Sequence, residues 1–522
     1  MPRPPTRLFR VGARSFASER KALEIAEGLA PMLNRSARLL RRVEQLSQNV
    51  TFTVTTRTIS RERIQAYRGS LRLPPIDRLL AREDEKGRTA MRLRALGFEV
   101  LDEGWFGVVA RGPAELARSV LGVELVLQAR AGLARLRSTQ IFRQNPGPPL
   151  PEELFVAPHR SLSLPADFSD DADDVVFEPP PLYFQPVSAT APTCAYPTID
   201  IATVRRHLNV PAGHTGAGAV VGMIDTGFYP HPYFAANGLD IERVSTRPGD
   251  TPEIDEVGHG TAMAFNVFAV APGARVKGFK HDLSLPAHVP LQRAGQAAMG
   301  VDIVSCSWGF EEEQVFGVVR ATIQKLVADG KIVLFAAGNG VRAWPASMNE
   351  VVAVGGVYAD PAGRLEASNY ASGFASIRYP GRIVPDVCGL CGQTPRGIYL
   401  MLPCPPGSRL DAAQAVAATG PADPAFPDSD ETDRSDGWAG ASGTSAATAQ
   451  IAGVASLLVA EARRLGKVLD NGGLKSILAR SATPVSIGRN FFGVEAAGPL
   501  PNQATGHGLV NAEAALKLVG QA

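Results

Sequence analysis

Two apolar segments that each end in a polar residue constrain the fold of this 522-residue chain most strongly. The first, AVVGMIDTGF (219–228), leads into Asp225, and the second, KIVLFAAGNG (331–340), leads into Asn339. A short continuous apolar run that is bounded by turn residues is typical of a strand buried on both faces, as in a parallel sheet. We therefore predict an α/β fold in which Asp225 and Asn339 lie at the carboxyl ends of two buried strands.

A histidine and a serine each precede a segment rich in small residues. His259 lies between two glycines in GHGTAMAFNVFAV (258–270), and Ser445 lies in SGTSAATAQIAG (442–453). Both patterns predict a tight turn that leads into a buried helix. The N-terminus of a helix presents N–H groups without helical partners and the positive end of the helix dipole, and both stabilise a developing oxyanion. A serine in such a place is also an ordinary helix cap, so it is not decisive alone.

The order of these residues along the chain indicates nucleophilic catalysis. A serine nucleophile needs a base within hydrogen-bond reach and a carboxylate that fixes the tautomer of that base. Asp225, His259 and Ser445 supply the carboxylate, the base and the nucleophile in one of the three common orders of such a triad. An Asn amide held at a strand end, such as that of Asn339, can donate a hydrogen bond to the oxyanion.

The four segments resemble the motifs of the subtilisin-like serine peptidases, the subtilase family. The resemblance extends over about residues 200–520 and is carried by Asp225-Thr226-Gly227, His259-Gly260-Thr261, Ala337-Gly338-Asn339 and Gly443-Thr444-Ser445. It implies a three-layer α/β fold with a mostly parallel sheet over residues 201–522, and serine endopeptidase activity on protein or peptide substrates. The alternative is a catalytically silent scaffold or binding protein of the same fold, which the intact triad and Asn339 disfavour.

The chain departs from the family directly after the nucleophile. The family usually has Met, two small residues, Pro and His there, whereas this chain has Ala446-Ala447-Thr448-Ala449-Gln450. Pro in the first turn of a helix is helpful but dispensable, and no residue that the chemistry needs is missing. We therefore interpret the chain as a divergent member.

The segment SCSWG (305–309) resembles the substrate-binding strand of the family. The resemblance implies that Ser307, Trp308 and Gly309 pair with an extended peptide. We expect Trp308 and the residues around Gly338, including Ala337, to shape the binding pockets. Three acidic residues follow at 311–313. They either favour basic substrate side chains or complement the dipole of a helix that they open.

The first 143 residues are predicted to form a separate N-terminal domain. A helical extension over residues 1–48 precedes the pattern strand, helix, two strands, helix, strand over residues 50–130. The predicted elements are a strand at 51–58, a helix at 76–96, a hairpin of 98–103 with 105–111, a helix at 113–122 and a last strand at 123–130. This is the split βαβ, or ferredoxin-like, arrangement. An unrelated small α/β domain is the alternative.

Subtilase propeptides have this ferredoxin-like fold, and residues 93–125 also resemble the propeptide of the related sedolisin peptidases. Sedolisins use Glu and Asp where this chain has His259 and Asn339, so we expect the chemistry of a subtilase. The resemblance implies that the enzyme is made as a zymogen with its own propeptide as intramolecular inhibitor. An imidazole base works best near its own pKa, which suits neutral pH.

Charge divides the chain in the same place. Residues 1–150 hold 27 Lys and Arg against 14 Asp and Glu, a formal +13, and the remainder holds 26 (53 − 27) against 37 (51 − 14), a formal −11. Such opposite charges favour complementary surfaces within one chain. Nucleic-acid binding is not expected, because the arginines are spread out and no aromatic-rich motif accompanies them. Residues 144–200, rich in Pro and acidic residues, are predicted to be an extended linker that contains the processing site.

No cofactor is expected to be required, although Ca²⁺ is a possible ligand. In the acidic insertion at 421–437, oxygen ligands at alternate positions suit Ca²⁺. The candidate ligands are Asp428, Asp430, Asp433 and Asp436, with Glu431 beside them. The alternative is a solvated loop. Cys388-x-x-Cys391 has no second pair and no nearby histidine, so zinc is not expected. The odd number of cysteines and the lack of a signal segment favour reduced thiols, with one disulfide as the alternative.

The chain shows no apolar run of about 18 residues and no apolar signal segment near its basic N-terminus. We therefore expect no membrane span and no secretory signal, and a protein that is cytoplasmic or exported by a non-classical route.

Overall fold

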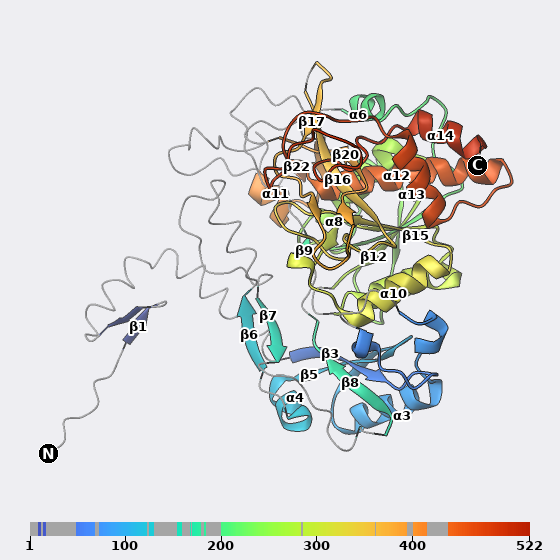
Figure 1. The fold of residues 1–522 in the computed structure, drawn as a ribbon. Helices are drawn as coiled ribbons and strands as arrows, with labels where there is room; N and C mark the ends of the chain where they lie inside the picture. Colours follow the sequence, from blue (N-terminus) through green and yellow to red (C-terminus); the bar gives the residue numbers. More distant parts are fainter. Residues whose placement is uncertain are drawn as a thin grey trace.

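The computed structural model describes residues 9–11, 14–16, 49–67, 73–122, 125–129, 154–158, 168, 170–178, 182–183, 200–282, 285–360, 362–393, 400–414 and 437–521. These residues form a large α/β body and a smaller N-terminal sheet with helices, which lies beside it (Figure 1). A short antiparallel pair, β1 (Phe9–Val11) with β2 (Arg14–Phe16), occurs where the sequence predicts only a helical extension. The remainder of the predicted helical extension, including all of residues 17–48, lies outside the described residues.

The large body is built on one eight-stranded sheet. The order is β11-β12-β10-β13-β15-β16-β17, and β20 also pairs with β16. All of these pairings are parallel except that of β17 with β16. The bounds are β10 Val220–Asp225, β11 Ile241–Val244, β12 Arg275–Lys280, β13 Ile303–Cys306, β15 Ile332–Ala336, β16 Val352–Ala359, β17 Leu365–Ala367 and β20 Val387–Leu390. The mostly parallel sheet that the sequence predicts is thus confirmed.

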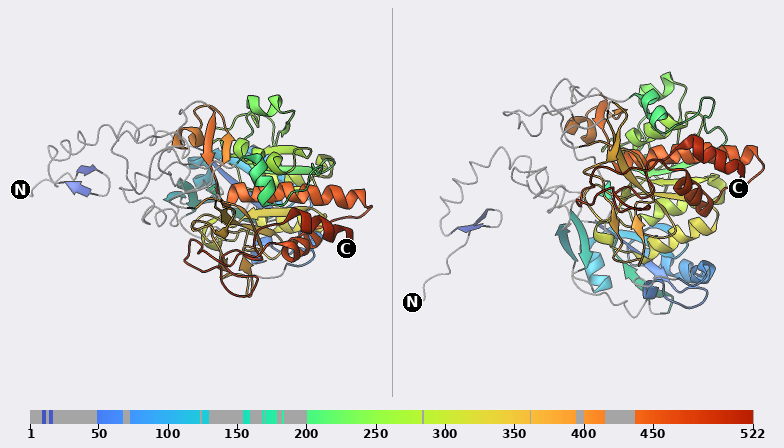
Figure 2. Two further views of the ribbon diagram at one scale, coloured as in Figure 1. Left: turned by 90° about the horizontal axis from the view of Figure 1, so that it is seen from above. Right: turned by 45° about the horizontal axis from the view of Figure 1, so that its top comes forward.

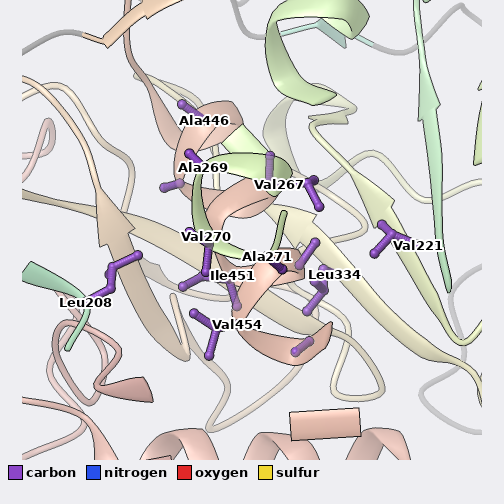
Figure 3. Close-up of a cluster of buried hydrophobic side chains, with 14 of the residues drawn as sticks. Leu208, Val221, Val267, Ala269, Val270, Ala271, Leu334, Ala446, Ile451 and Val454 are labelled. Carbon is purple, nitrogen blue, oxygen red and sulfur yellow. The ribbon is translucent and has the colours of Figure 1, made fainter. Parts of the chain in front are cut away.

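Helices cover both faces of this sheet, which makes three layers. One apolar core lies between the sheet and α8 (His259–Val270), α12 (Thr444–Arg464), α13 (Asn471–Ser481) and α14 (Ala512–Gln521). Figure 3 shows part of this core, where Val267 and Val270 of α8 face Ile451 and Val454 of α12. A second core lies between the opposite face and α9 (His288–Gly295) with α10 (Gly317–Ala328). Short helices α6 (Ile201–His207), α7 (Pro232–Ala236) and α11 (Arg409–Gln414) lie at the periphery.

Helix α12 is, among the described residues, long and apolar enough to cross a membrane by length and composition alone. Of its most apolar window, 89% is buried inside the protein. Small residues such as Gly453 allow it to pack closely, because a Cβ at this position would lie 2.7 Å from Val270 Cβ of α8. Its apolar composition is therefore that of a central core helix.

Four two-stranded ribbons complete the strands of the body and its neighbourhood. They pair β14 (Trp308–Gly309) with β9 (Leu182–Tyr183), β18 (Phe374–Ala375) with β19 (Ile383–Val384), β21 (Leu400–Pro403) with β22 (Trp438–Ala441), and β6 (Leu125–Ala129) with β7 (Leu154–Pro158). Each of these ribbons is antiparallel.

The N-terminal sheet has four strands in the order β4-β5-β3-β8 with antiparallel pairing throughout. Its elements are β3 (Asn49–Thr56), α3 (Glu83–Ala95), β4 (Glu99–Gly104), β5 (Gly107–Pro113), α4 (Ala114–Leu121) and β8 (Ala172–Val176). Alternate residues of β3, including Phe52 and Val54, point into a separate apolar core under α3 and α4. This order is the ferredoxin-like arrangement that the sequence predicts.

The fourth strand of this sheet corrects the sequence-based assignment. Residues 123–130 were expected to complete the sheet, but β6 pairs with β7, and β8 from the expected linker lies beside β3. The acidic run around β8 suggested a solvated linker. Instead, Asp171 lies 2.8 Å from Arg88 and 3.3 Å from Arg92 of α3, and Val175 is buried in the apolar core. The ion pairs of Asp171 and the burial of Ala172 and Val175 hold this acidic segment at the edge of the sheet.

Helix α3 also differs from the expectation of one helix over residues 76–96. A 3₁₀ turn, η2 (Ile76–Leu79), is separated from α3 by Leu80, Ala81 and Arg82. Ala81 pairs with Thr58 as an isolated bridge, and its N–H donates to Trp105 O at 2.8 Å. These contacts require extended backbone, which interrupts the helix.

The N-terminal sheet packs on α9 and α10, as the views of Figures 1 and 2 show. Phe106 and Leu79 share an apolar cluster with Val318 of α10. Trp105 N donates to Gln292 Oε1 of α9 at 3.0 Å, and Lys325 Nζ lies 5.0 Å from the centre of the Trp105 ring. The contact therefore combines an apolar centre with specific polar and cation–π interactions.

Candidate active site

Asp225 and His259 form a buried hydrogen-bonded pair. Asp225 is the last residue of β10, and His259 is the first residue of α8. The distance from His259 Nδ1 to Asp225 Oδ1 is 2.7 Å, and both side chains are 1% exposed. Thr226 N donates to the same Oδ1 at 2.8 Å. The carboxylate is therefore oriented toward one nitrogen of the imidazole.

Ser445 lies in the first turn of α12, directly after Gly443 and Thr444. Its hydroxyl donates to Ser307 O at 3.0 Å, and the Ser307 hydroxyl donates to Ser445 O at 3.0 Å. Ser307 follows β13, which lies beside β10 in the sheet. The reciprocal bonds therefore hold the start of α12 at the carboxyl edge of the sheet, next to the strand that ends in Asp225.

Asn339 lies just beyond β15, the next strand of the sheet after β13. Its Oδ1 accepts hydrogen bonds from Thr444 N and from Thr444 Oγ1, both at 3.1 Å. Because an amide oxygen only accepts and an amide nitrogen only donates, these two bonds determine the orientation of the side-chain amide. The Nδ2 donor is therefore directed away from Thr444, and the residue that precedes Ser445 holds the amide.

The four residues that the sequence predicts to be catalytic lie at one edge of the sheet, where Asp225 pairs with His259, Ser307 bonds to Ser445, and Thr444 bonds to Asn339. Asp225, Ser307 and Asn339 follow or end three adjacent strands, β10, β13 and β15. Because these strands are parallel, their carboxyl ends meet at one edge of the sheet, where open α/β sheets bind ligands. Helices α8 and α12 bring His259 and Ser445 to this edge and pack against each other.

Among the residues expected to bind substrate, the structure separates the backbone of Trp308 and Gly309 from the Trp308 side chain. Trp308 and Gly309 form β14, and their backbone pairs with Leu182–Tyr183. The Trp308 side chain is fully buried in the second apolar core, and its Nε1–H donates to Ile224 O at 2.9 Å. Because the indole is buried in this core, the expectation that it shapes a binding pocket is wrong. Only the backbone of β14 can pair with an extended peptide.

The two residues before Asn339 also contribute through the backbone. Ala337 is fully buried in the second core, and its N–H donates to Val354 O at 2.9 Å. Gly338 has φ +108°, and a Cβ there would lie 2.9 Å from Val341 O. Its carbonyl accepts from Ser372 N at 2.8 Å. Glycine is required here because the turn needs a positive φ and has no room for a side chain.

The acidic residues at 311–313 do not open an α-helix. They form a 3₁₀ turn, and α10 begins four residues later at Gly317. Glu313 is fully buried and accepts hydrogen bonds from Ser376 Oγ and Ile377 N. This carboxylate therefore holds the loop at 376–377, which neither of the two sequence-based interpretations anticipated.

Sequence analysis missed Asp255, a buried carboxylate four residues before His259. It accepts four hydrogen bonds, from Thr226 Oγ1 at 2.7 Å, Gly258 N at 2.9 Å, Thr261 N at 2.9 Å and Thr261 Oγ1 at 2.7 Å. Burial raises its pKa above the usual range, and the hydrogen bonds from Thr261 and Thr226 oppose this shift. The signal available in the sequence was an acidic residue three positions before the Gly-His-Gly turn.

The described cysteines are Cys306, Cys388, Cys391 and Cys404, and all four are buried and outside disulfide bonds. Burial raises the pKa of the Cys391 thiol to about 11. Among the described residues, no group of three or more His, Cys, Asp or Glu side chains could hold a metal ion. The candidate Ca²⁺ ligands at 428, 430, 433 and 436 lie outside the described residues.

Comparison with protein families gives one match. A model of the subtilase family matches residues 216–508, which is more than half of the chain and includes Asp225, His259, Asn339 and Ser445. No curated protein matches the chain. The matched range begins before β10 and leaves the N-terminal sheet outside it.

Proposed function

This chain belongs to the subtilase family of serine peptidases, and on that premise we propose that it is an endopeptidase made as an inactive precursor. The observation that carries the proposal is the buried Asp225–His259 pair at the edge where Ser445 and Asn339 are held. A hydrogen-bonded acid and base beside a helix-start serine is the arrangement that nucleophilic attack on a carbonyl requires.

In the proposed reaction, Ser445 attacks the carbonyl carbon of the scissile peptide bond. Because Asp225 Oδ1 binds the Nδ1 side of His259, the opposite nitrogen, Nε2, serves as the base. The Ser445 hydroxyl turns from Ser307 O to His259, gives up its proton and forms the acyl-enzyme. The leaving amine takes that proton from the imidazolium, and water then repeats the sequence to release the acid.

The oxyanion of the tetrahedral intermediate needs preorganised donors. We assign this role to Asn339 Nδ2 and to the backbone N–H of Ser445, which belongs to the first turn of α12. The two hydrogen bonds from Thr444 to Asn339 Oδ1 support the assignment, because they fix the amide before the substrate arrives. A donor that needs no reorganisation stabilises the transition state more than the ground state.

The N-terminal domain is proposed to be the inhibitor of the same chain. The backbone of Leu182–Tyr183 pairs with β14, the strand proposed to bind substrate, and the domain itself packs on α9 and α10. A strand that already pairs with β14 prevents a substrate from pairing there. The tether keeps the inhibitor at high effective concentration, so inhibition persists until the chain is cut.

A fluorophosphonate probe tests the catalytic half of the proposal, because it reacts only with an activated serine. We expect the processed enzyme to react and the Ser445→Ala protein not to react. Peptide hydrolysis should fall on the order of 10⁶-fold in the same variant. A processed parent protein that neither reacts with the probe nor cleaves peptides would favour the silent scaffold.

The proposal that the N-terminal domain inhibits the uncut chain needs a separate experiment. A site for an unrelated protease, inserted between residues 184 and 199, allows the full chain to be cut on demand. We expect hydrolysis to rise after the cut and the removal of the N-terminal fragment, and to fall when that fragment is added back. Equal activity of the intact and the stripped protein would refute the inhibitory role.

A further inference from the structure

The loop before His259 carries a second carboxylate, and that carboxylate has no place in the triad. Asp255 is 2% exposed, and its four hydrogen bonds come from two different turns. Oδ1 accepts from Gly258 N and Thr226 Oγ1, and Oδ2 accepts from the N–H and the hydroxyl of Thr261. Both oxygens thus accept two hydrogen bonds each, which is the bonding that suits an ionised carboxylate.

These bonds connect the turn that holds the acid to the turn that holds the base. Thr226 follows Asp225 directly, and its hydroxyl donates to Asp255 while accepting from Gly260 N at 3.1 Å. Gly258 directly precedes His259, and Thr261 follows it by two residues in the first turn of α8. Asp255 is therefore hydrogen-bonded to the residue after Asp225 and to the residue before His259.

The surrounding backbone keeps the Asp255 loop against the same turns. A Cβ at Gly227 would lie 2.2 Å from Ile254 O, so the two segments are already in close contact. Lys280 Nζ donates to Ile254 O at 2.7 Å, and Phe228 N donates to Pro252 O at 2.8 Å. Because these bonds anchor the loop at Pro252 and Ile254, Asp255 has little freedom to follow a displaced His259.

We propose that Asp255 is a positioning residue for the peptidase reaction, which holds the imidazole of His259 against Asp225 and adds a second negative charge beside the imidazolium that forms during catalysis. The inference rests on the proposed function. It goes beyond the triad, because Asp255 acts through Thr226, Gly258 and Thr261 and not on the substrate. A negative charge at the start of α8 also complements the helix dipole.

The substitution Asp255→Asn tests this role, because it keeps the shape of the side chain but replaces one acceptor with a donor, which in either orientation faces a backbone N–H, that of Gly258 or that of Thr261. We expect kcat to fall about 10²-fold with KM within about threefold, as for a misplaced base. The acid limb of the pH profile of kcat/KM should shift to lower pH, because a lost negative charge disfavours the protonated imidazole.

Asp250→Asn is the matched control. Asp250 lies in the same loop and accepts from Thr246 N at 2.9 Å and Thr246 Oγ1 at 2.8 Å, away from both catalytic turns. This variant should keep the kcat and the pH profile of the parent. If Asp255→Asn behaved like Asp250→Asn, or lost activity only in proportion to a lower unfolding temperature with an unshifted acid limb, the positioning role would be refuted.

A measurement independent of turnover separates this inference from the proposed function. In full-length Ser445→Ala protein, the hydrogen-bonded Nδ1 proton of His259 should give a far-downfield proton resonance. We expect Asp255→Asn in that background to shift or remove the resonance, and Asp250→Asn to leave it in place. If the parent chain proved inactive toward the probe and peptides, an unchanged resonance in Asp255→Asn would still count against Asp255, and a lost one would support it.

Discussion

Replacing Gly260 with alanine should disable the catalytic edge without removing any catalytic group. Gly260 is the second residue of α8, and a Cβ there would lie 2.1 Å from Gly227 O and 3.0 Å from Asp225 Cβ. A carbon–oxygen contact needs about 3.3 Å, so the helix start and the turn must separate by about 1.2 Å. The obstructing atom is backbone, and Gly227 is itself wedged against Ile254 O, so neither side yields easily.

A displacement of this size between acid and base should lower kcat by about 10²-fold or more, because a misplacement of about 1 Å has that effect on a catalytic constellation. Overpacking should also destabilise the protein by about 1–3 kcal/mol. Steady-state kinetics and thermal unfolding measure the two effects. Gly472→Ala is the control, because Gly472 is exposed on α13 and a Cβ there would meet no atom closer than 3.7 Å. A Gly260→Ala enzyme within about threefold of the parent kcat would refute the reasoning.

Three further predictions concern the oxyanion and the N-terminal domain. Asn339→Ala should lower kcat about 10²–10³-fold with little change in KM, and an effect on KM alone would contradict the oxyanion role. Trp105→Ala should weaken docking and raise the activity of the uncut chain, whereas Met91→Ala on the exposed side of α3 should not. Burial raises the pKa of Asp102, which lies beside α9, so we expect docking of the N-terminal domain to be accompanied by proton uptake at this carboxyl group. Retention of the nicked N-terminal fragment in gel filtration should therefore be strongest below the ordinary carboxyl pKa and weaken as the pH rises through the raised value, a dependence that Asp102→Asn removes.

The placement of the four proposed catalytic residues could be predicted because its signals are local. An apolar run of strand length followed by a turn residue determines which residue emerges at the edge of a parallel sheet, and this held for Asp225 and Asn339. Glycines beside His259 and before Ser445 indicate where helices begin. Each of these signals lies within about ten residues of the side chain that it positions.

Other features depend on contacts that no local pattern records. A strand of two residues, such as β14, has too few side chains to reveal which face is buried, so the direction of the Trp308 indole could not be derived. Asp255 lies in a polar loop, and its importance appears only when that loop folds back on Thr226. The pairing of β8 with β3 spans more than 100 residues and uses charges that alone indicate a solvated segment.

The place of β8 in the N-terminal sheet limits where a cut can free the proposed inhibitor. Residues 130–171 separate β8 from the other strands of this sheet along the sequence, yet β8 forms the edge of the sheet beside β3. A cut before Ala172 would leave this strand on the catalytic fragment and still inserted in the sheet, so the two fragments would stay joined by strand complementation. Only a cut beyond Val176 separates whole folding units, and one beyond Tyr183 also takes away the strand that pairs with β14. If the N-terminal domain is the inhibitor that we propose, nicking and activation are distinct events, and a protein cut in the earlier stretch would look processed on a denaturing gel while remaining one particle in solution.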